Sequence, residues 1–337
     1  MKKILATAIA LTIGAAACMF AACTGDEGTA YTVYAPDGAP ALALANAVNE
    51  DEEGQYDFHI VESSAITAQV TGEVPAADFC ILPVNAAAKL LGDGTTYQML
   101  GTVTNGNMYL LTTGDNPAIT HNNLSTLVGK TVGVVQLANV PGLTFRAVLE
   151  ANNIDYQILG NDGEAAADKV NLQAFADAST VTPASGCDYY LCPEPAATSK
   201  INGTASSANP FQLAGSLQTL YDGENGYPQA VLVAKTSVIE EAKSVVDTLI
   251  TYMEGSAGYL ASASPSDVVA LLEDCYTDGM TPSLNANNLN ATVIANCSVR
   301  FTAAQDCKAR VNEFLSELIA ISPEFTTTVS DSFYYAG

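Results

Sequence analysis

The stretch Val33–Val48, with the sequence VYAPDGAPALALANAV, places a short apolar strand directly before a turn and the start of a helix. The strand is expected at Val33–Ala35, and Pro36-Asp37-Gly38 has the composition of a tight turn. Pro40 then stands where the first turn of a helix tolerates proline. The first N–H groups of a helix have no partner inside it, so we expect them to point at whatever lies above the end of the strand.

The same succession of strand, turn and helix recurs along the chain. Tyr56–Val61 is followed by Ser63-Ser64, and the buried run Thr131–Val135 is followed by Gln136–Asn139. Strands that alternate with helices in this way are typical of βαβ units, so the sequence predicts the α/β class with mostly parallel sheets. Residues 160–185 and 202–210 are rich in small polar residues and are predicted to be loops, with a helix inside the first.

After a returning strand at 229–234 the chain is predicted to be mostly helical. Ser237 with Glu240 and Thr302 with Gln305 have the spacing of capping boxes, and Ser264-Pro265 has the signature of a third helix start. The apolar stripes of these helices need a sheet to cover, and the first sheet is the one available. The chain is therefore expected to cross between two lobes twice, near 112–117 and near 232–236. Residues 31–113 plus 235–337 would form an outer lobe, and residues 114–234 an inserted one.

Length and charge set limits on the kind of protein. A chain of 337 residues exceeds the size at which a single hydrophobic core stops growing, so we expect two domains. Its 36 acidic side chains against 12 basic ones give a formal net charge of −24. Such a charge disfavours nucleic acid and anionic membrane surfaces as partners.

The N-terminus has the organisation of an export signal. Met1-Lys2-Lys3 precedes the uncharged apolar run Ile4–Ala22. The run ends in Phe20-Ala21-Ala22-Cys23, which resembles the lipobox of bacterial lipoproteins, so Cys23 is predicted to carry a lipid anchor and residues 1–22 to be removed. Residues 23–30 would form a short tether. An ordinary signal-peptidase site near Ala22 is the alternative. We expect an exported protein anchored to the outer face of the bacterial cytoplasmic membrane.

Cysteines raise the question of disulfides because the protein is expected to be exported. In a strand, Cys187 and Cys192 would stand roughly 16 Å apart, whereas a disulfide requires Cα atoms within about 7 Å. We therefore predict no bond between them. A bond among Cys275, Cys297 and Cys307 stays open.

The sequence offers no activated nucleophile and no zinc motif. A catalytic Ser or Cys needs a nearby base, but the two histidines, His59 and His121, fall in a predicted strand and beside a helix start, where structural roles are expected. Two histidines also cannot complete the usual zinc sites. We predict a protein that is not an enzyme and holds no metal and no cofactor.

Candidate binding residues follow the predicted strands, because ligands of open α/β sheets lie beyond the carboxyl ends of the strands. Nearly all of these candidates are neutral hydrogen-bonding residues, and two are carboxylates. The candidates are Asp37, Gly38, Ser63, Ser64, Pro83, Asn85, Asn107, Tyr109, Gln136, Asn139, Glu194 and Tyr227. Each has a structural alternative. Ser63, Ser64 and Asn139 could cap helices, Asp37 could close a turn on Ala39, and Glu194 could be a solvated loop charge. The repetition at the end of several strands, rather than any single residue, indicates a binding site.

Several segments resemble the substrate-binding lipoproteins of ABC importers, of the nitrate/sulfonate/taurine and thiamine-precursor type. They are the lipobox, Ala35–Pro40, Ile81–Asn85, Gly106–Leu110, Gly129–Gly133 and Glu194-Pro195-Ala196. The resemblance covers roughly residues 30–335. It implies a type II periplasmic-binding-protein fold, in which two mostly parallel α/β lobes joined by two crossover hinges close on a ligand. It also implies a monomer that docks onto an ABC permease in the membrane.

The resemblance assigns ligand-binding roles to Asp37, Gly38, Ala39, Pro40, Ser63, Ser64, Asn85, Asn107, Gln136, Leu137, Asn139 and Glu194. Helix N-termini favour anions, but the only basic residue expected nearby is Arg146, and Asp37 and Glu194 would repel a fully anionic guest. We expect a small organic molecule that is neutral, zwitterionic or has an amino-pyrimidine-like cationic part, as in a thiamine precursor, and next a sulfonate. The chain departs from typical members in having no tryptophan.

Two other functions stay open. The first is an enzyme on the same fold, such as a lyase or a pyrimidine synthase, although the site histidine and clustered cysteines of the fungal pyrimidine synthases do not appear in this sequence. The second is a sensor or adhesin lobe that binds a protein partner.

Overall fold

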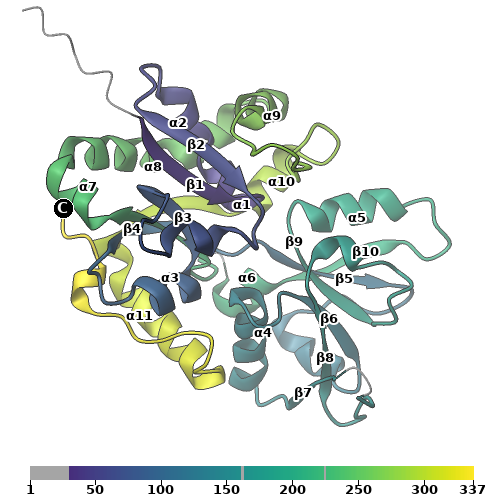
Figure 1. Cartoon of the computed structure of the whole chain (residues 1–337). Helices are drawn as coiled ribbons and strands as arrows, with labels where there is room; N and C mark the ends of the chain where they lie inside the picture. Colours follow the sequence, from purple (N-terminus) through teal and green to yellow (C-terminus); the bar gives the residue numbers. More distant parts are fainter. Residues whose placement is uncertain (1–29, 161–162, 224) are drawn as a thin grey trace, which may run out of the picture.

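The computed structural model describes residues 30–160, 163–223 and 225–337, and two mixed β-sheets organise this part of the chain (Figure 1). The predicted signal segment 1–22, the predicted lipid-bearing Cys23 and the tether up to residue 29 lie outside the described residues. We call the first sheet with its helices lobe 1, and the second sheet with its helices lobe 2.

The sheet of lobe 1 has six strands within the described residues, in the order β12-β4-β11-β3-β1-β2. Strand β1 pairs in parallel with β2 and with β3, whereas β11 runs antiparallel to β3 and β4, and β12 runs antiparallel to β4. The strands are β1 Tyr31–Pro36, β2 Tyr56–Val61, β3 Phe79–Pro83, β4 Tyr97–Thr104, β11 Ala230–Lys235 and β12 Val299–Ala303.

The sheet of lobe 2 has the order β10-β5-β9-β6-β8-β7, again six strands in the described part of the chain. Strands β6, β7, β8 and β9 pair in parallel, and β5 runs antiparallel to β9 and β10. The strands are β5 Met108–Thr113, β6 Thr131–Val135, β7 Tyr156–Ile158, β8 Val170–Phe175, β9 Tyr189–Pro193 and β10 Phe211–Ser216.

Helices cover both sheets (Figure 1). Lobe 1 carries α1 Ala39–Ala43, α2 Ala45–Glu50, α3 Val84–Leu91, α7 Thr236–Glu241, α8 Lys243–Ser262, α9 Pro265–Glu273, α10 Ala291–Asn296 and α11 Ala304–Ile321. Lobe 2 carries α4 Val140–Ala151, α5 Ala196–Thr204 and α6 Leu217–Asp222. Short 3₁₀ turns are η1 Ile66–Val70, η2 His121–Leu127, η3 Ala178–Thr180 and η4 Asp331–Phe333.

The chain crosses between the sheets at positions that differ from the predicted ones. Strand β5 already belongs to lobe 2, so the first crossing lies at 105–107 rather than near 112–117. The return lies between α6 and β11, before the predicted 232–236. The predicted boundaries, 31–113 plus 235–337 and 114–234, are therefore wrong by several residues. The apolar runs on either side of residues 105–107 gave no sign of which sheet each would join.

Some local predictions were wrong because they assumed loops where the chain continues as regular structure. Residues 170–175 form β8, not a helix inside a loop, and β10, β12 and α6 were missed. The two predicted capping boxes are also wrong. Helices α7 and α11 each follow a strand directly, with Lys235 and Ala303 at their N-cap positions and no side-chain cap. Ser237 therefore lies inside α7, and Thr302 lies in β12. The third start is confirmed, since the Ser264 hydroxyl accepts a hydrogen bond from the Asp267 N–H.

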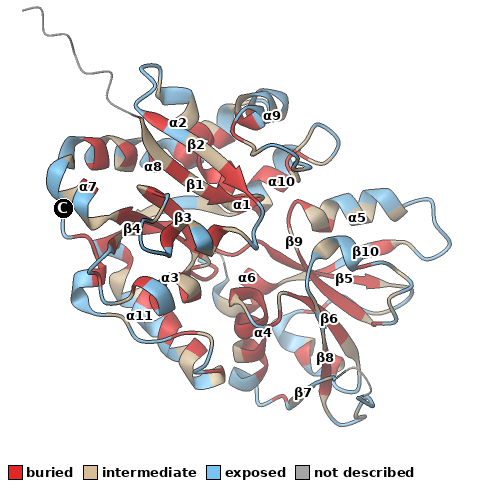
Figure 2. Ribbon diagram, in the orientation of Figure 1, coloured by how far each residue is buried: buried red, intermediate tan, exposed pale blue. Residues whose placement is uncertain are grey.

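The main hydrophobic core runs through both lobes. One cluster of buried side chains includes Leu82 and Leu232 from the first sheet and Leu110, Val134 and Leu191 from the second. In Figure 2 the central strands are buried while the outward faces of the helices are exposed. In the described part of the chain, no helix has the length and apolar character needed to cross a membrane.

The cysteines beyond position 23 are free and buried. The prediction of no Cys187–Cys192 bond is confirmed, and the question left open for Cys275, Cys297 and Cys307 is answered in the same way. Burial raises the pKa of these thiols, for example to about 11 for Cys187 and Cys275.

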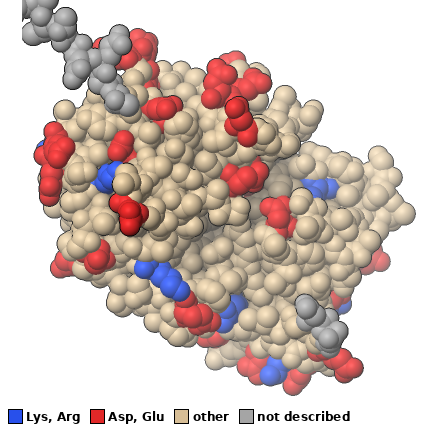
Figure 3. Space-filling view, viewed as in Figure 1, with Lys and Arg blue, Asp and Glu red and all other residues tan. Residues whose placement is uncertain are grey.

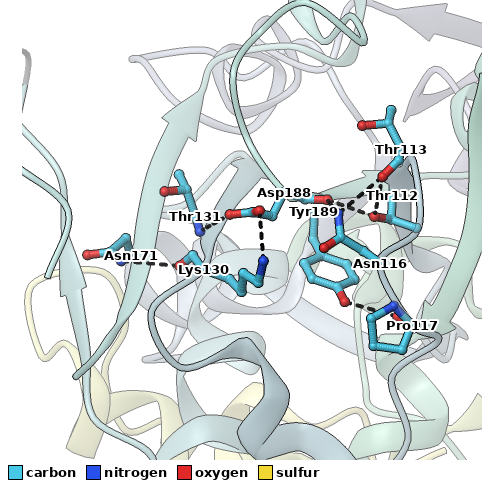
Figure 4. Close-up of polar contacts among 9 residues, drawn as sticks. All are labelled: Thr112, Thr113, Asn116, Pro117, Lys130, Thr131, Asn171, Asp188 and Tyr189. Atoms are coloured by element: carbon cyan, nitrogen blue, oxygen red, sulfur yellow. Dashed lines mark hydrogen bonds and ion pairs between the residues drawn. The ribbon is translucent and has the colours of Figure 1, made fainter. Parts of the chain in front are cut away.

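A polar network closes the amino-terminal edge of the lobe 2 sheet (Figure 4). The Asp188 carboxylate accepts hydrogen bonds from Lys130 Nζ at 3.2 Å and from the Thr131 N–H at 2.9 Å. The Asp188 carbonyl accepts the Thr112 hydroxyl at 2.8 Å, and Tyr189 donates to the Pro117 carbonyl at 3.0 Å. These contacts fasten the start of β6 and β9 to the end of β5.

Candidate functional site

Three predicted segments lie at the carboxyl ends of the parallel strands of the lobe 1 sheet, which we call its strand-end edge. Strands β1, β2 and β3 are parallel, and Pro36 at the end of β1 is in register with Val61 at the end of β2. The Asp37 N–H continues this pairing by donating to the Val61 carbonyl at 3.0 Å. The turn 37–40, the Ser63-Ser64 pair and Asn85 therefore follow neighbouring strand ends, as the sequence predicted.

The remaining predicted residues meet at the corresponding edge of the lobe 2 sheet. Strands β6 and β9 are parallel, so Gln136 and Glu194 follow neighbouring strand ends. Strand β5 starts there, because Met108 is paired with Pro193 in the antiparallel ladder. This register places Asn107 beside Glu194, whose N–H donates to the Asn107 carbonyl at 2.9 Å, and pairs Tyr109 with Cys192.

The two edges are in contact through α10. The Tyr109 hydroxyl of lobe 2 donates to the Asn296 carbonyl of lobe 1 at 3.2 Å. Asn296 Nδ2 in turn donates to Glu194 Oε1 at 3.0 Å. The space-filling view in Figure 3 shows a face that is hollowed between the two lobes. Tyr109 and Glu194 of lobe 2 thus lie against α10 of lobe 1.

Asp37 is occupied by partners from its own chain. Its carboxylate accepts hydrogen bonds from the Gly38 N–H at 2.8 Å and the Tyr276 hydroxyl at 3.0 Å. It also accepts the Ser283 hydroxyl at 2.8 Å and the Ser283 N–H at 2.9 Å. Burial and the Asp37 charge raise the pKa of Tyr276 above its ordinary value. The carboxylate therefore fixes the 276–283 segment over the first strand end, and closes no turn on Ala39.

The turn before α1 depends on Gly38, whose φ of 100° is the left-handed region that favours glycine. Ala39 is buried and Pro40 is half-buried in the first turn of α1, as the sequence predicted for a proline at this position. Helix α1 itself ends at Ala43, and Leu44 is both its C-cap residue and the N-cap residue of α2. The predicted single helix is therefore two short ones.

The serine and asparagine side chains are not used as helix caps. Ser63 and Ser64 are exposed, and the N-cap position of η1 is occupied by Ala65, which makes no side-chain cap. Asn139 occupies the cap position of α4, but no hydrogen bond from its side chain caps the helix. These three side chains keep their hydrogen-bonding capacity at the two strand-end edges.

The β6–α4 turn is held by backbone contacts. Gln136 has a φ of 55°, its N–H donates to the Phe175 carbonyl at 2.8 Å, and the Asn139 N–H donates to its carbonyl at 2.9 Å. Leu137 is buried, and a Cβ added to Gly142 would lie 2.1 Å from the Leu137 carbonyl oxygen. The close approach of α4 to this turn therefore requires glycine.

Asn85 is 3% exposed in the first turn of α3. Its Nδ2 donates to the Phe325 carbonyl at 3.2 Å. Its Oδ1 has no hydrogen-bond partner among the described residues. A buried acceptor without a partner is unfavourable by about 1–3 kcal/mol, so this oxygen is a position where a donor group would be stabilising.

Asn107 connects the two crossings. Its Oδ1 accepts from Gln229 Nε2 at 2.7 Å, and its N–H donates to Gln229 Oε1 at 3.0 Å. Its Nδ2 donates to the Glu194 carbonyl at 3.1 Å. Both ends of the amide are therefore used within the protein, and the side chain holds the hinge region rather than facing open space.

Glu194 is 3% exposed, so the alternative of a solvated loop charge is wrong. Its carboxylate accepts hydrogen bonds from the Thr198 N–H at 3.0 Å, the Thr198 hydroxyl at 2.7 Å and Asn296 Nδ2 at 3.0 Å. Burial, with a smaller contribution from this carboxylate, raises the pKa of the neighbouring Tyr109. Like Asp37, Glu194 is paired with donors of its own chain.

Arg146 is also paired inside the protein. It is 8% exposed on α4, and its Nε donates to the Tyr156 hydroxyl at 3.1 Å. Its Nη2 donates to the Ile321 carbonyl at the end of α11, at 3.0 Å. The only basic residue predicted near the site therefore joins lobe 2 to lobe 1.

Sequence reasoning missed Tyr276, Ser283 and Asn296, which pair with the two carboxylates. In residues 274–298 the sequence analysis considered only Cys275 and Cys297, as possible disulfide partners. A signal was present in the dense asparagines from Asn285 to Asn296, because asparagine favours turns and caps over helix interiors.

A cavity of about 600 Å³ lies elsewhere at the junction of the lobes. Helices α4, α6 and α11 line it, and its polar residues include Glu150, Arg310, Glu313 and Glu317. None of the predicted site residues lines this cavity. Among the described residues, no three His, Cys, Asp or Glu side chains gather as metal ligands would.

No protein-family model and no curated protein sequence matches this chain. Solved structures are similar to it in fold. An ABC transporter protein from Parabacteroides distasonis is 16% identical, with 91% of this chain and 99% of that chain covered and a TM-score of 0.67. The chain has the fold of ABC transporter binding proteins.

Two further solved structures support this fold. The periplasmic aliphatic sulphonate binding protein SsuA from Escherichia coli is 14% identical, with 89% of this chain and 94% of that chain covered and a TM-score of 0.55. The ligand-binding component of an ABC-type import system from Staphylococcus aureus, solved with zinc bound, is 9% identical, with 91% and 96% covered and a TM-score of 0.54. At these identities the likeness establishes the fold, two mixed α/β sheets with their helices.

Proposed function

We propose that the protein is an extracytoplasmic solute-binding protein that captures a small organic molecule between its two lobes and delivers it to the permease of an ABC importer. The observation that carries the proposal is that one segment, residues 276–296, contacts a strand-end carboxylate in each lobe, Asp37 in lobe 1 and Glu194 in lobe 2. In open α/β folds ligands bind at this end of the strands. The similarity in fold to ABC transporter binding proteins agrees with it.

The pairing of the charged side chains bears on the ligand. Asp37 and Glu194 already accept hydrogen bonds from protein donors, so neither carboxylate is a free partner for a cation. Arg146 is likewise paired, so no basic residue predicted for the site is free for an anion. The groups with capacity left are neutral: Ser63, Ser64, Asn85, Gln136 and Asn139. We therefore favour an uncharged or zwitterionic ligand over a cationic pyrimidine.

A sulfonate is the second choice, as expected from the sequence. The helix starts at the strand ends favour an anion. The surface around them opposes it, because acidic side chains predominate on the face shown in Figure 3 and the formal net charge is −24. The helix starts and the acidic surface thus act in opposite directions. Together they favour a small ligand whose negative group is offset by a positive one.

The export signal and the lipid on Cys23 are part of the proposal. Replacing Cys23 by Ala should release the protein from the membrane fraction of cells that produce it. A mass spectrum of the mature protein should show the chain beginning at residue 23 with added acyl groups. A mature chain that begins near residue 23 without acyl groups would favour the ordinary signal-peptidase site.

Native mass spectrometry of protein purified without denaturation tests the binding function. We expect a co-purified small molecule, or a rise in melting temperature with one member of a panel of amino acids, vitamin precursors, pyrimidines and organosulfonates. A ligand at 100 times its Kd stabilises the native state by about 2.7 kcal/mol. A complete panel without a shift and a bare native mass would contradict the proposal. Turnover of a panel compound would favour an enzyme instead.

A further inference from the structure

Residues 274–298, which we call the strap, connect α9 to β12 and include α10. The strap begins as an added edge of the lobe 1 sheet, because the Ile60 N–H donates to the Cys275 carbonyl at 2.7 Å and the Thr277 N–H donates to the Ile60 carbonyl at 3.0 Å. Its buried side chains Leu284 and Val293 pack in one cluster with Leu42 of α1. The strap is therefore an integral part of lobe 1.

The strap contacts a strand-end carboxylate in each lobe. In lobe 1, Tyr276 and Ser283 supply three hydrogen bonds to Asp37. In lobe 2, Asn296 donates to Glu194 through its amide and accepts the Tyr109 hydroxyl through its carbonyl. A single stretch of chain thus joins the end of β1 to the start of β5 and the end of β9.

The two attachments differ in strength. The lobe 1 side combines the Asp37 hydrogen bonds, the pairing with β2 and apolar packing. Among the described residues, the hydrogen bonds to lobe 2 are the two of Asn296, one of which is to the buried Glu194 carboxylate, and the Ser298 carbonyl accepts the N–H of Asn105 in the first crossing at 3.1 Å. Motion that separates the lobes at the strand ends would therefore break the Asn296 contacts first and leave the strap on lobe 1.

We propose that Asn296 is a latch that holds the strand-end edges of the two lobes together. The latch does not depend on what the protein binds. Its consequence, that a ligand reaches the strand ends only after the Asn296 contacts open, rests on the proposed binding function.

The substitution Asn296→Asp tests the latch with almost no change in size. It replaces the amide donor by a carboxylate that faces Glu194, so attraction becomes repulsion. The matched control is Asn287→Asp, which adds the same charge to an exposed position of the same strap. Tyr109→Phe is a second variant that removes the other hydrogen bond without adding charge.

Hydrogen–deuterium exchange of the purified protein without ligand is the measurement. In Asn296→Asp we expect exchange about tenfold faster in peptides that span 107–112 and 193–198. We expect no change in 280–286 or in β6, and a smaller increase at the same two peptides in Tyr109→Phe. The Asn287→Asp control should match the wild type.

Two outcomes would overturn the latch. One is exchange at 107–112 and 193–198 that is the same in Asn296→Asp as in the wild type. The other is an increase spread evenly over both sheets, which would indicate general destabilisation. Neither depends on a ligand, so the latch and the binding function can fail separately: a panel without a hit leaves these exchange rates unaffected.

Discussion

Glu194 is the residue whose role changes most between sequence and structure. The Glu194→Ala substitution removes the acceptor of the Thr198 N–H, the Thr198 hydroxyl and the Asn296 amide. Donors left unpaired in a buried site are unfavourable, so we expect a loss of about 2–3 kcal/mol in the free energy of unfolding. Urea unfolding measures it. The control is Glu73→Ala in an exposed loop, which should stay within about 0.5 kcal/mol of the wild type. Equal stability of both variants would contradict the buried role.

The candidate site could be predicted only in part at this scale. The positions of Asp37 and Glu194 follow from strand ends that are visible in the sequence. Their partners do not, because Ser283 lies 246 residues from Asp37 and Asn296 lies 102 residues from Glu194. Hydrogen bonds between such distant residues depend on tertiary packing, which local patterns do not encode. A carboxylate at a strand end therefore looked free for a ligand when it was not.

The crossing between β4 and β5 depends on a glycine. Gly106 has a φ of 91°, and an added Cβ would lie 2.7 Å from Cε1 of Tyr227, a buried ring. Gly106→Ala thus combines backbone strain with a clash, and we expect a loss of about 2–4 kcal/mol. Gly114→Ala separates the two effects, because Gly114 has a φ of 67° but open space around it. It should cost about 1 kcal/mol. Equal losses in urea unfolding would mean that the clash is relieved.

The strength of the apolar pattern decided which elements could be predicted. Strands β2 and β6 have the predicted bounds, because an alternating or wholly apolar run is bordered by turn residues in each case. Strand β10 was missed because it is an edge strand whose Gln212 and Leu213 are exposed. Strand β12, also at an edge, has half-buried and exposed residues throughout. Edge strands bury less apolar surface, so their sequences carry a weaker signal.

The whole molecule should lose stability in alkali. Burial raises the pKa of Cys187 and Cys275 from 9.0 to about 11. The native state therefore retains protons that the unfolded chain releases above pH 9. The stabilisation is complete below that pH and is lost as the pH rises through about 11. Urea midpoints measured under reducing conditions should fall over this range, and less steeply in Cys187→Ala. A constant midpoint would contradict the burial of these thiols.

The two lobes should unfold together because one core runs through both. Phe314 of α11 is 1% exposed, and its ring lies 5.6 Å from the ring of Tyr221 and 5.8 Å from that of Tyr227, centroid to centroid. Phe314→Ala should cost about 3–5 kcal/mol and weaken this contact between α11 and α6. Its control is Phe79→Ala, an equally buried ring within the lobe 1 sheet.

We expect wild type and Phe79→Ala to unfold in single transitions, with far-UV circular dichroism and tyrosine fluorescence coincident. In Phe314→Ala the two signals should separate, because the tyrosines at the junction report its opening before the sheets unfold. Exchange at α6 and at residues 225–229 should rise in this variant alone. Two transitions in the wild type would mean that the lobes unfold independently. Coincident signals in Phe314→Ala would mean that the contacts of α4 with α11, including the hydrogen bond from Arg146 to the Ile321 carbonyl, suffice to couple the lobes.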